Sequence, residues 1–122
     1  MSQDHSKLPN NLSYLTRLTI KGEDKFFGPG ISKLMHLVDT TGSLRKSCSI
    51  MGMSYSKAWK IIKIAEKNLG FPLLISSVGG SGGGNSVISP EGREFLNSYD
   101  AFVEESQNLL NDVFSKYFKN NF

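Results

Sequence analysis

The sequence predicts a mainly α-helical fold with small β elements. Apolar residues recur at i, i+3, i+4 and i+7 in several stretches, which is the spacing of one face of a helix. Strand-like alternation is confined to short runs beside glycine-rich or charged turns. At 122 residues, the chain is long enough for one hydrophobic core. We therefore expect a flexible N-terminus over residues 1–11, a compact domain over 12–89 and a long C-terminal helix over 90–122.

A short hairpin and a helix are expected before residue 42. Leu18 and Ile20 alternate with polar residues, and KGED turns the chain before Phe26 and Phe27, which predicts a hairpin. The GPG sequence at 28–30 breaks the chain, and an amphipathic helix follows to about Gly42. Its apolar face is Ile31, Leu34, Met35 and Val38. His36 falls on the outer face with no second His or Cys at ligand spacing, so we expect a surface residue rather than a metal ligand.

Residues 42–70 read as two helices joined by a turn of about three residues. Ser43 is placed to cap the first helix, and Gly52 supplies the left-handed backbone that commonly ends one. Ser54 can cap a second helix that runs to Leu69. Cys48 lies on the apolar face of the first helix, where it is expected to be a small core residue. Two capped helices and a tight turn predict a helix-turn-helix.

The second of these helices has an apolar stripe and a basic face. At about 100° per residue, its buried stripe is Ala58, Ile62, Ala65 and Leu69. From Ser43 to Gly70 there are six basic residues against Glu66, a local charge of +5. A solvated lysine face is one interpretation, but the preceding capped helix and the Ser and Tyr at the N-terminal end favour a recognition helix that binds double-stranded DNA. The expected DNA-binding residues here are Ser54, Tyr55, Ser56, Lys57, Lys60, Lys63, Lys67, Arg45 and Lys46.

Trp59 lies on the same helix, about 100° from the buried stripe. We expect it to be chiefly a packing residue that sets the tilt of the helix, rather than a base contact.

A strand, loop and strand follow the recognition helix, an arrangement typical of a wing. The strands are expected at Pro72–Ser77 and Val87–Ile88, and the wing at 78–86, with Gly80, Gly82 and Gly83 offering main-chain N–H groups to DNA. A phosphate-cradling nucleotide loop is disfavoured because the G-x-x-x-x-G-K-[ST] pattern is absent. A plain flexible hairpin loop remains the alternative, since no Lys or Arg occurs between Phe71 and Glu91.

Ser89, Pro90 and Glu91 predict the start of the last helix. If it runs to about Phe118, it is about 43 Å long, which is more than a domain of this size can cover. A seven-residue apolar repeat therefore predicts a homodimer through this helix, and folding back onto its own domain is the alternative. The expected dimerisation residues are Leu96, Tyr99, Val103, Leu110, Val113 and Tyr117. Between Glu91 and Asp112 the local charge is −5.

Several classes of protein are disfavoured by the same sequence. The lone cysteine excludes an internal disulfide and a CxxC metal site. No paired carboxylates, nucleophile with a base, or ligand cluster is recognisable, so we expect no catalytic residues, no cofactor and no metal. No apolar run is long enough for a membrane span, and the N-terminus does not resemble a signal peptide, so a cytoplasmic protein is expected.

With these elements placed, the chain resembles the N-terminal winged-helix domain of ModE-type regulators, a distant cousin of the LysR-type DNA-binding domain. The resemblance covers about residues 12–100 and rests on GPG (28–30), TGSL (41–44), MGMSYSKAWK (51–60), the GGSGGGN loop and SPEG (89–92). It implies a dimeric, sequence-specific transcription regulator of prokaryotic type. Full-length ModE continues into molybdate-binding domains whereas this chain stops at Phe122, so we expect a stand-alone DNA-binding form without molybdate binding.

The expected fold is thus a winged helix-turn-helix with a long C-terminal dimerisation helix. The expected function is sequence-specific DNA binding in transcription regulation, with the helix at about 54–69 in the major groove and the wing against the backbone or minor groove. A winged-helix module for protein–protein interaction, without specific DNA binding, is the alternative from another class. The salt dependence of duplex binding distinguishes the two.

Overall fold

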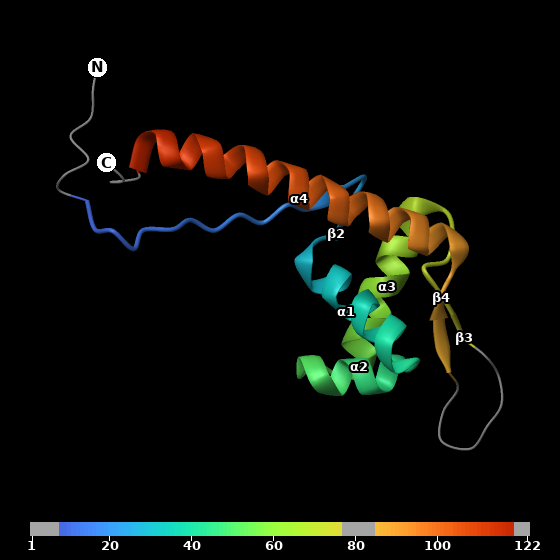
Figure 1. Cartoon of the computed structure of the whole chain (residues 1–122). Helices are drawn as coiled ribbons and strands as arrows, with labels where there is room; N and C mark the ends of the chain where they lie inside the picture. Colours follow the sequence, from blue (N-terminus) through green and yellow to red (C-terminus); the bar gives the residue numbers. More distant parts are fainter. Residues whose placement is uncertain (1–7, 77–84, 119–122) are drawn as a thin grey trace. The chain divides into compact units, whose positions relative to one another are not determined.

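The computed structural model describes residues 8–76 and 85–118, which form four helices and two small antiparallel sheets (Figure 1). The mainly helical fold class with small β elements is thereby confirmed. In order, the elements are β1 Ile20–Lys21, β2 Lys25–Phe27, α1 Pro29–Thr41, α2 Leu44–Met51, α3 Tyr55–Leu69, β3 Leu74–Ser76, β4 Ser86–Ile88 and α4 Pro90–Phe118. None of the helices in these residues is long and apolar enough to cross a membrane.

The chain divides into two compact units. The larger unit is Arg17–Asp100, and the smaller unit combines the described residues of Met1–Thr16 with those of Ala101–Phe122. Helix α4 contributes its first part to the larger unit and its second part to the smaller one.

The core of the larger unit forms around α1. Leu34, Met35 and Val38, on one face of this helix, are fully buried, as the spacing predicts. The ring of Phe27, just before α1, meets the rings of Phe95 and Tyr99 edge-on at centroid distances of 4.8 and 5.0 Å. The hairpin, α1 and the start of α4 therefore share one apolar core.

Cys48 is also in this core, as expected, and its burial raises the pKa of the thiol. The thiol is therefore held in its neutral form, which is the less reactive one.

Helix α4 begins on a buried serine cap. The Ser89 hydroxyl accepts a hydrogen bond from the Gly92 N–H at 2.8 Å and donates to the Pro72 carbonyl, while the Ser89 N–H donates to the Leu73 carbonyl. A Cβ on Gly92 would lie 2.6 Å from the Leu73 carbonyl oxygen. Only glycine therefore lets the first turn of α4 approach the backbone before β3 this closely.

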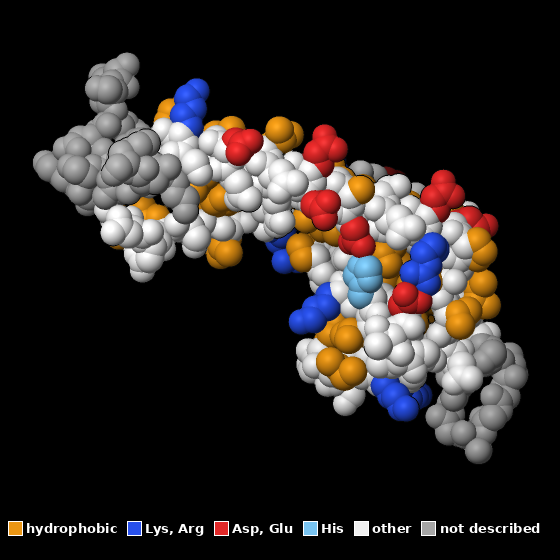
Figure 2. Space-filling model, in the orientation of Figure 1, with side chains coloured by type: hydrophobic (Ala, Val, Ile, Leu, Met, Phe, Trp, Pro, Cys, Tyr) orange, Lys and Arg blue, Asp and Glu red, His pale blue; other side chains and the backbone are white. Residues whose placement is uncertain are grey.

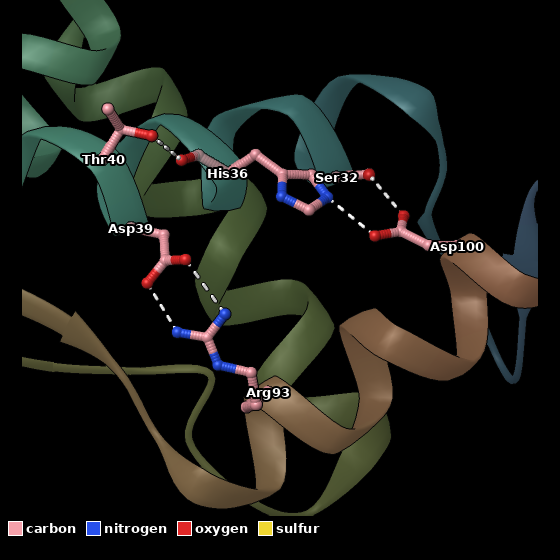
Figure 3. A network of polar contacts seen from close by, with 6 residues as sticks. All are labelled: Ser32, His36, Asp39, Thr40, Arg93 and Asp100. Atoms are coloured by element: carbon pink, nitrogen blue, oxygen red, sulfur yellow. Dashed lines mark hydrogen bonds and ion pairs between the residues drawn. The ribbon is translucent and has the colours of Figure 1, made fainter.

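Polar contacts fasten α1 to the start of α4 (Figure 3). The Arg93 guanidinium donates two hydrogen bonds to the carboxylate of Asp39, and His36 Nε2 lies 2.7 Å from Asp100 Oδ2. The hydrogen bonds from Arg93 lower the pKa of Asp39, because they favour the charged carboxylate. His36 is an exposed residue, as predicted, with an acidic partner on the facing helix.

Two residues predicted for dimerisation lie in the core of this chain instead. Leu96 is fully buried, and Tyr99 is buried with its hydroxyl donating to the Leu18 carbonyl at 2.7 Å. A seven-residue repeat shows which face of a helix is apolar, but not how far the helix's own domain covers that face. The first part of the predicted stripe is therefore unavailable to a second copy.

The remainder of the stripe lies in the smaller unit and is largely uncovered. Val103 is half-buried, while Leu110, Val113 and Tyr117 are exposed. The chain around Tyr14 covers a different part of the helix, because the Tyr14 ring lies 4.8 Å from that of Phe114. The Tyr14 hydroxyl also donates to Asn111 Oδ1.

Candidate nucleic-acid interface

Helices α2 and α3 are joined by the three-residue turn that the sequence predicts. The Ser43 hydroxyl caps α2 by accepting from the Lys46 N–H at 3.0 Å, and the Ser54 hydroxyl caps α3 by accepting from the Lys57 N–H at 3.1 Å. Gly52 ends α2 with φ of 71°, and the next N–H donates back to the Cys48 carbonyl at 3.0 Å. Local hydrogen bonds thus set the geometry of the α2–turn–α3 segment.

A buried serine supports the entry into α2. The Ser47 hydroxyl donates to the Ser43 carbonyl at 2.7 Å and lies 3.0 Å from the Thr41 hydroxyl oxygen. Ser47 is fully buried, so these hydrogen bonds offset the cost of removing its hydroxyl from water. The end of α1 and the start of α2 are thereby linked.

Helix α3 separates apolar and basic side chains as predicted. Ala58, Ile62 and Ala65 are buried, and Leu69 is half-buried at the end of the stripe. The residues predicted to contact DNA on this helix are all exposed, as are Arg45 and Lys46 of α2. The positions concerned are Ser54, Tyr55, Ser56, Lys57, Lys60, Lys63 and Lys67.

The lysines of α3 differ in their surroundings. Lys63 Nζ lies 3.2 Å from Glu66 Oε1, and among the described residues no ion pair is formed by Lys57, Lys60 or Lys67. Glu66 has a second role, because its other carboxylate oxygen accepts from the Leu73 N–H at 2.7 Å. The positive charge of Lys63 is therefore partly neutralised in the free protein, and Lys60 offers the less compensated cation.

Tyr55 connects the two helices at the N-terminal end of α3. The guanidinium of Arg45, on α2, lies 4.4 Å from the centre of its ring. Such stacking orients a basic group without neutralising its charge. Arg45 and Tyr55 are thus held as a pair at the end of α3 where recognition helices meet base edges.

The expectation that Trp59 is a packing residue is wrong. Its side chain is 51% exposed, and Lys63 Nζ lies 5.1 Å from the centre of its ring. The buried side chains of α3 are Ala58, Ile62 and Ala65, and Trp59, about 100° around the helix from that stripe, lies outside the packed face. Trp59 therefore belongs to the exposed aromatic and basic surface of α3.

The strands around the predicted wing form a regular antiparallel pair. Leu74 pairs with Ile88, Ile75 with Val87, and Ser76 with Ser86. The Ser86 N–H also donates to the carbonyl of Gly42 at 2.9 Å, so β4 is attached to the junction between α1 and α2.

The predicted wing itself, residues 78–86, lies mostly outside the described residues. Gly80, Gly82 and Gly83, its three predicted DNA-binding residues, belong to the part that the structure does not describe. Their role stays a prediction.

One contact beside α3 was not anticipated from the sequence. Asn68 donates from its side-chain nitrogen to the carboxylate of Asp24 at 3.0 Å, and its side-chain oxygen accepts from the Asp24 N–H. This side-chain pair ties the turn of the β1–β2 hairpin to the C-terminal half of α3. A lone Asn on a helix and a lone Asp in a turn give no periodic signal, so only the fold reveals the pair.

The distribution of charge is uneven across the molecule. On the face shown in Figure 2, Asp and Glu side chains gather over α4. Within the described residues, no group of three or more His, Cys, Asp or Glu side chains could hold a metal ion. The exposed face of α3, with its neighbours on α2, carries basic side chains of the kind that meet a polyanion.

The sequence is similar to a class of molybdenum-related regulatory and binding proteins. It is 29% identical to the transcriptional regulator ModE of Yersinia pestis over 97 residues, which are 79% of this chain and 37% of that protein. It is 29% identical to the molybdenum transport protein ModE of Herbaspirillum seropedicae over 93 residues, 76% of this chain and 31% of that protein. Identity to the molybdenum-pterin-binding protein MopB of Rhodobacter capsulatus is also 29%, over 77 residues, 63% of this chain and 28% of that protein.

The chain thus spans about a third of the length of the curated relatives it matches. No protein-family model matches it.

Proposed function

We propose that this chain is a winged helix-turn-helix that binds double-stranded DNA in a sequence-specific manner and regulates transcription. The observation that carries the proposal is the exposed face of α3, which carries lysines and a tyrosine. This helix follows a three-residue turn that begins at the C-cap of α2 and ends at the N-cap of α3. The similarity to a protein named transcriptional regulator ModE supports it independently. In this proposal α3 lies in the major groove, and the glycine-rich residues 78–86 form the wing.

The position of each side chain along α3 suggests its part in binding. Tyr55 and Ser56 lie in the first turn, where they can reach base edges. Lys60 and Lys67 lie further along the exposed face, where phosphates are the natural partners of a lysine ammonium. Arg45, stacked on Tyr55, would hold a phosphate at the groove edge.

The proposal includes a homodimer formed by the second part of α4. Leu110, Val113 and Tyr117 are exposed on a helix that continues 18 residues beyond Asp100, from Ala101 to Phe118. A twofold dimer would present two copies of α3, so the DNA site should be a pseudo-palindrome with half-sites about 34 Å, or a multiple, apart. Domain limits at 12–89 and 90–122 are part of the same proposal.

Molybdenum appears in the names of two of these relatives, the ModE of Herbaspirillum seropedicae and MopB, and the chain matches about a third of their length. The proposal therefore concerns DNA binding by the residues of this chain and assigns them no molybdate site.

Selection from a pool of random duplexes tests the proposal. The protein should enrich a short pseudo-palindromic sequence, and fluorescence anisotropy should show tighter binding to it than to a shuffled duplex. Lys60→Ala should weaken binding to both duplexes, while Lys33→Ala, on the exposed face of α1, serves as the matched control. No enrichment, with equal weak binding to all duplexes, would favour the protein-interaction module. An equal effect of Lys33→Ala and Lys60→Ala would remove α3 from the interface.

A further inference from the structure

A hollow of about 590 Å³ lies in the larger unit between the β1–β2 hairpin, the start of α1 and the side of α3. Its apolar lining includes Phe26 and Ile31, and it continues to Met53 and Ile61, on either side of the start of α3. The volume falls within the range of small-molecule sites, which are mostly apolar with a few polar groups that fix orientation.

The charged groups around this hollow have one sign. Arg17, Lys21 and Lys25 line it, and all three are exposed on the hairpin segment. No Asp or Glu is among the described residues that line it. The carboxylate of Asp24, in the hairpin turn, accepts from the side chain of Asn68 instead. The hollow therefore combines an apolar floor with basic side chains at its rim.

The amino end of α1 adds to the positive potential. Gly28, Gly30 and Ile31 line the hollow, and Gly28 precedes the helix without a side-chain hydrogen bond that caps it. The free N–H groups at the start of a 13-residue helix carry partial positive charge.

The two glycines of the GPG sequence differ in the space around them. A Cβ on Gly28 would lie 3.2 Å from the Thr19 hydroxyl, whereas a Cβ on Gly30 would meet no atom within 4 Å. Gly28 thus permits close packing of the hairpin, and Gly30 leaves open space beside the hollow. Position 30 can therefore accept a larger side chain.

From these contacts we propose that the hollow binds a small amphipathic organic anion, a carboxylate with an apolar body such as a medium-length acyl chain. The apolar body packs against Phe26, Ile31 and Ile61, and the carboxylate meets the basic side chains of the hairpin. The site does not include the side chains assigned to DNA binding, so the test of anion binding is independent of the test of the proposed function.

Nuclear magnetic resonance titration of the ¹⁵N-labelled full chain with sodium octanoate tests this proposal. Saturable shifts are expected for the amide signals of residues 25–28, of Gly30 and Ile31, and of Ile61. Octylammonium carries the same chain with the opposite charge and should bind at least about tenfold more weakly. Acetate, which has the charge without the apolar body, should not saturate the site.

Variants of the full chain locate the binding. Replacing both Lys21 and Lys25 by Ala should weaken octanoate binding by about three- to tenfold, because each exposed ion pair contributes modestly. Gly30→Leu should fill the hollow with a side chain and abolish octanoate binding. Amide signals away from α1 that match those of wild type will show that this variant is folded. Lys46→Ala, which removes a basic side chain on α2, is the matched control and should leave octanoate affinity unchanged.

Four results would overturn the proposal. Octylammonium could bind as tightly as octanoate, the double lysine variant could bind octanoate as well as wild type does, or the shifts could centre on the exposed apolar residues of α4. If the amide chemical shifts of residues around the hollow changed with protein concentration in the absence of octanoate, the hollow would be a contact with a second copy of the chain instead.

Discussion

Gly92→Ala is predicted to destabilise the larger unit by placing a methyl group against immovable backbone. The added Cβ would lie 2.6 Å from the Leu73 carbonyl oxygen, 2.9 Å from the Ser89 hydroxyl oxygen and 3.1 Å from the Leu73 Cα. Leu73 and Ser89 are fully buried, so neither neighbour can move into solvent. Overpacking of this kind costs about 1–3 kcal/mol, and the better helix propensity of alanine returns at most about 1 kcal/mol.

The expected net loss in the free energy of unfolding is therefore about 1–2 kcal/mol, equivalent to a melting temperature roughly 5–15 °C lower. Urea denaturation followed by circular dichroism measures it. Gly30→Ala is the matched control, because Gly30 also lies in the first turn of a helix but a Cβ there meets no atom within 4 Å. The control should be as stable as wild type or slightly more stable. Equal stability of the two variants would refute the claim that a Cβ at position 92 clashes with the backbone of Leu73.

Three further predictions concern DNA, assembly and pH. Ser56→Ala should reduce the preference for the selected duplex by about 1–3 kcal/mol and leave binding to a shuffled duplex nearly intact; equal losses on both would contradict a base contact. Val113→Lys should raise the dimer dissociation constant at least about tenfold in sedimentation experiments, because Val113 is 52% exposed and would be buried in the dimer, while Asn108→Lys should not. Asp39→Asn should lower stability at neutral pH but not in acid. Because Arg93 lowers the pKa of Asp39 below its ordinary 3.8, the stabilisation is complete above that value and is lost as the pH falls through the lower folded pKa. A difference between wild type and Asp39→Asn that persisted in urea at about pH 2 would contradict the ion-pair account.

The helix ends were predictable because their signals are local. Gly42, Gly52 and Gly70 all have positive φ and end their helices as C-caps. Ser43 and Ser54 cap the helices that they precede, through hydrogen bonds three residues along the chain. Each of these features depends on neighbouring residues, so a single sequence contains the required information.

Features that depend on distant partners were not predictable. Periodicity places Leu96 and Tyr99 on one apolar face with Val113, but only the fold shows that the first two are covered by their own domain. Similarly, a helical wheel places Glu66 nearer to the buried stripe of α3 than to its basic face. Its hydrogen bond to the Leu73 N–H, and the resulting partial neutralisation of Lys63, require the position of the chain after Gly70.

The salt dependence of duplex binding tests the central claim that α3 binds DNA through its basic face. Affinity for the selected duplex, measured by anisotropy across several salt concentrations, should fall steeply, and Lys60→Ala should reduce the slope of log K against log salt by about 0.9. Lys63→Ala should reduce that slope by less, because Glu66 already neutralises part of its charge. A flat slope for wild type, or slopes that neither substitution changes, would contradict the claim.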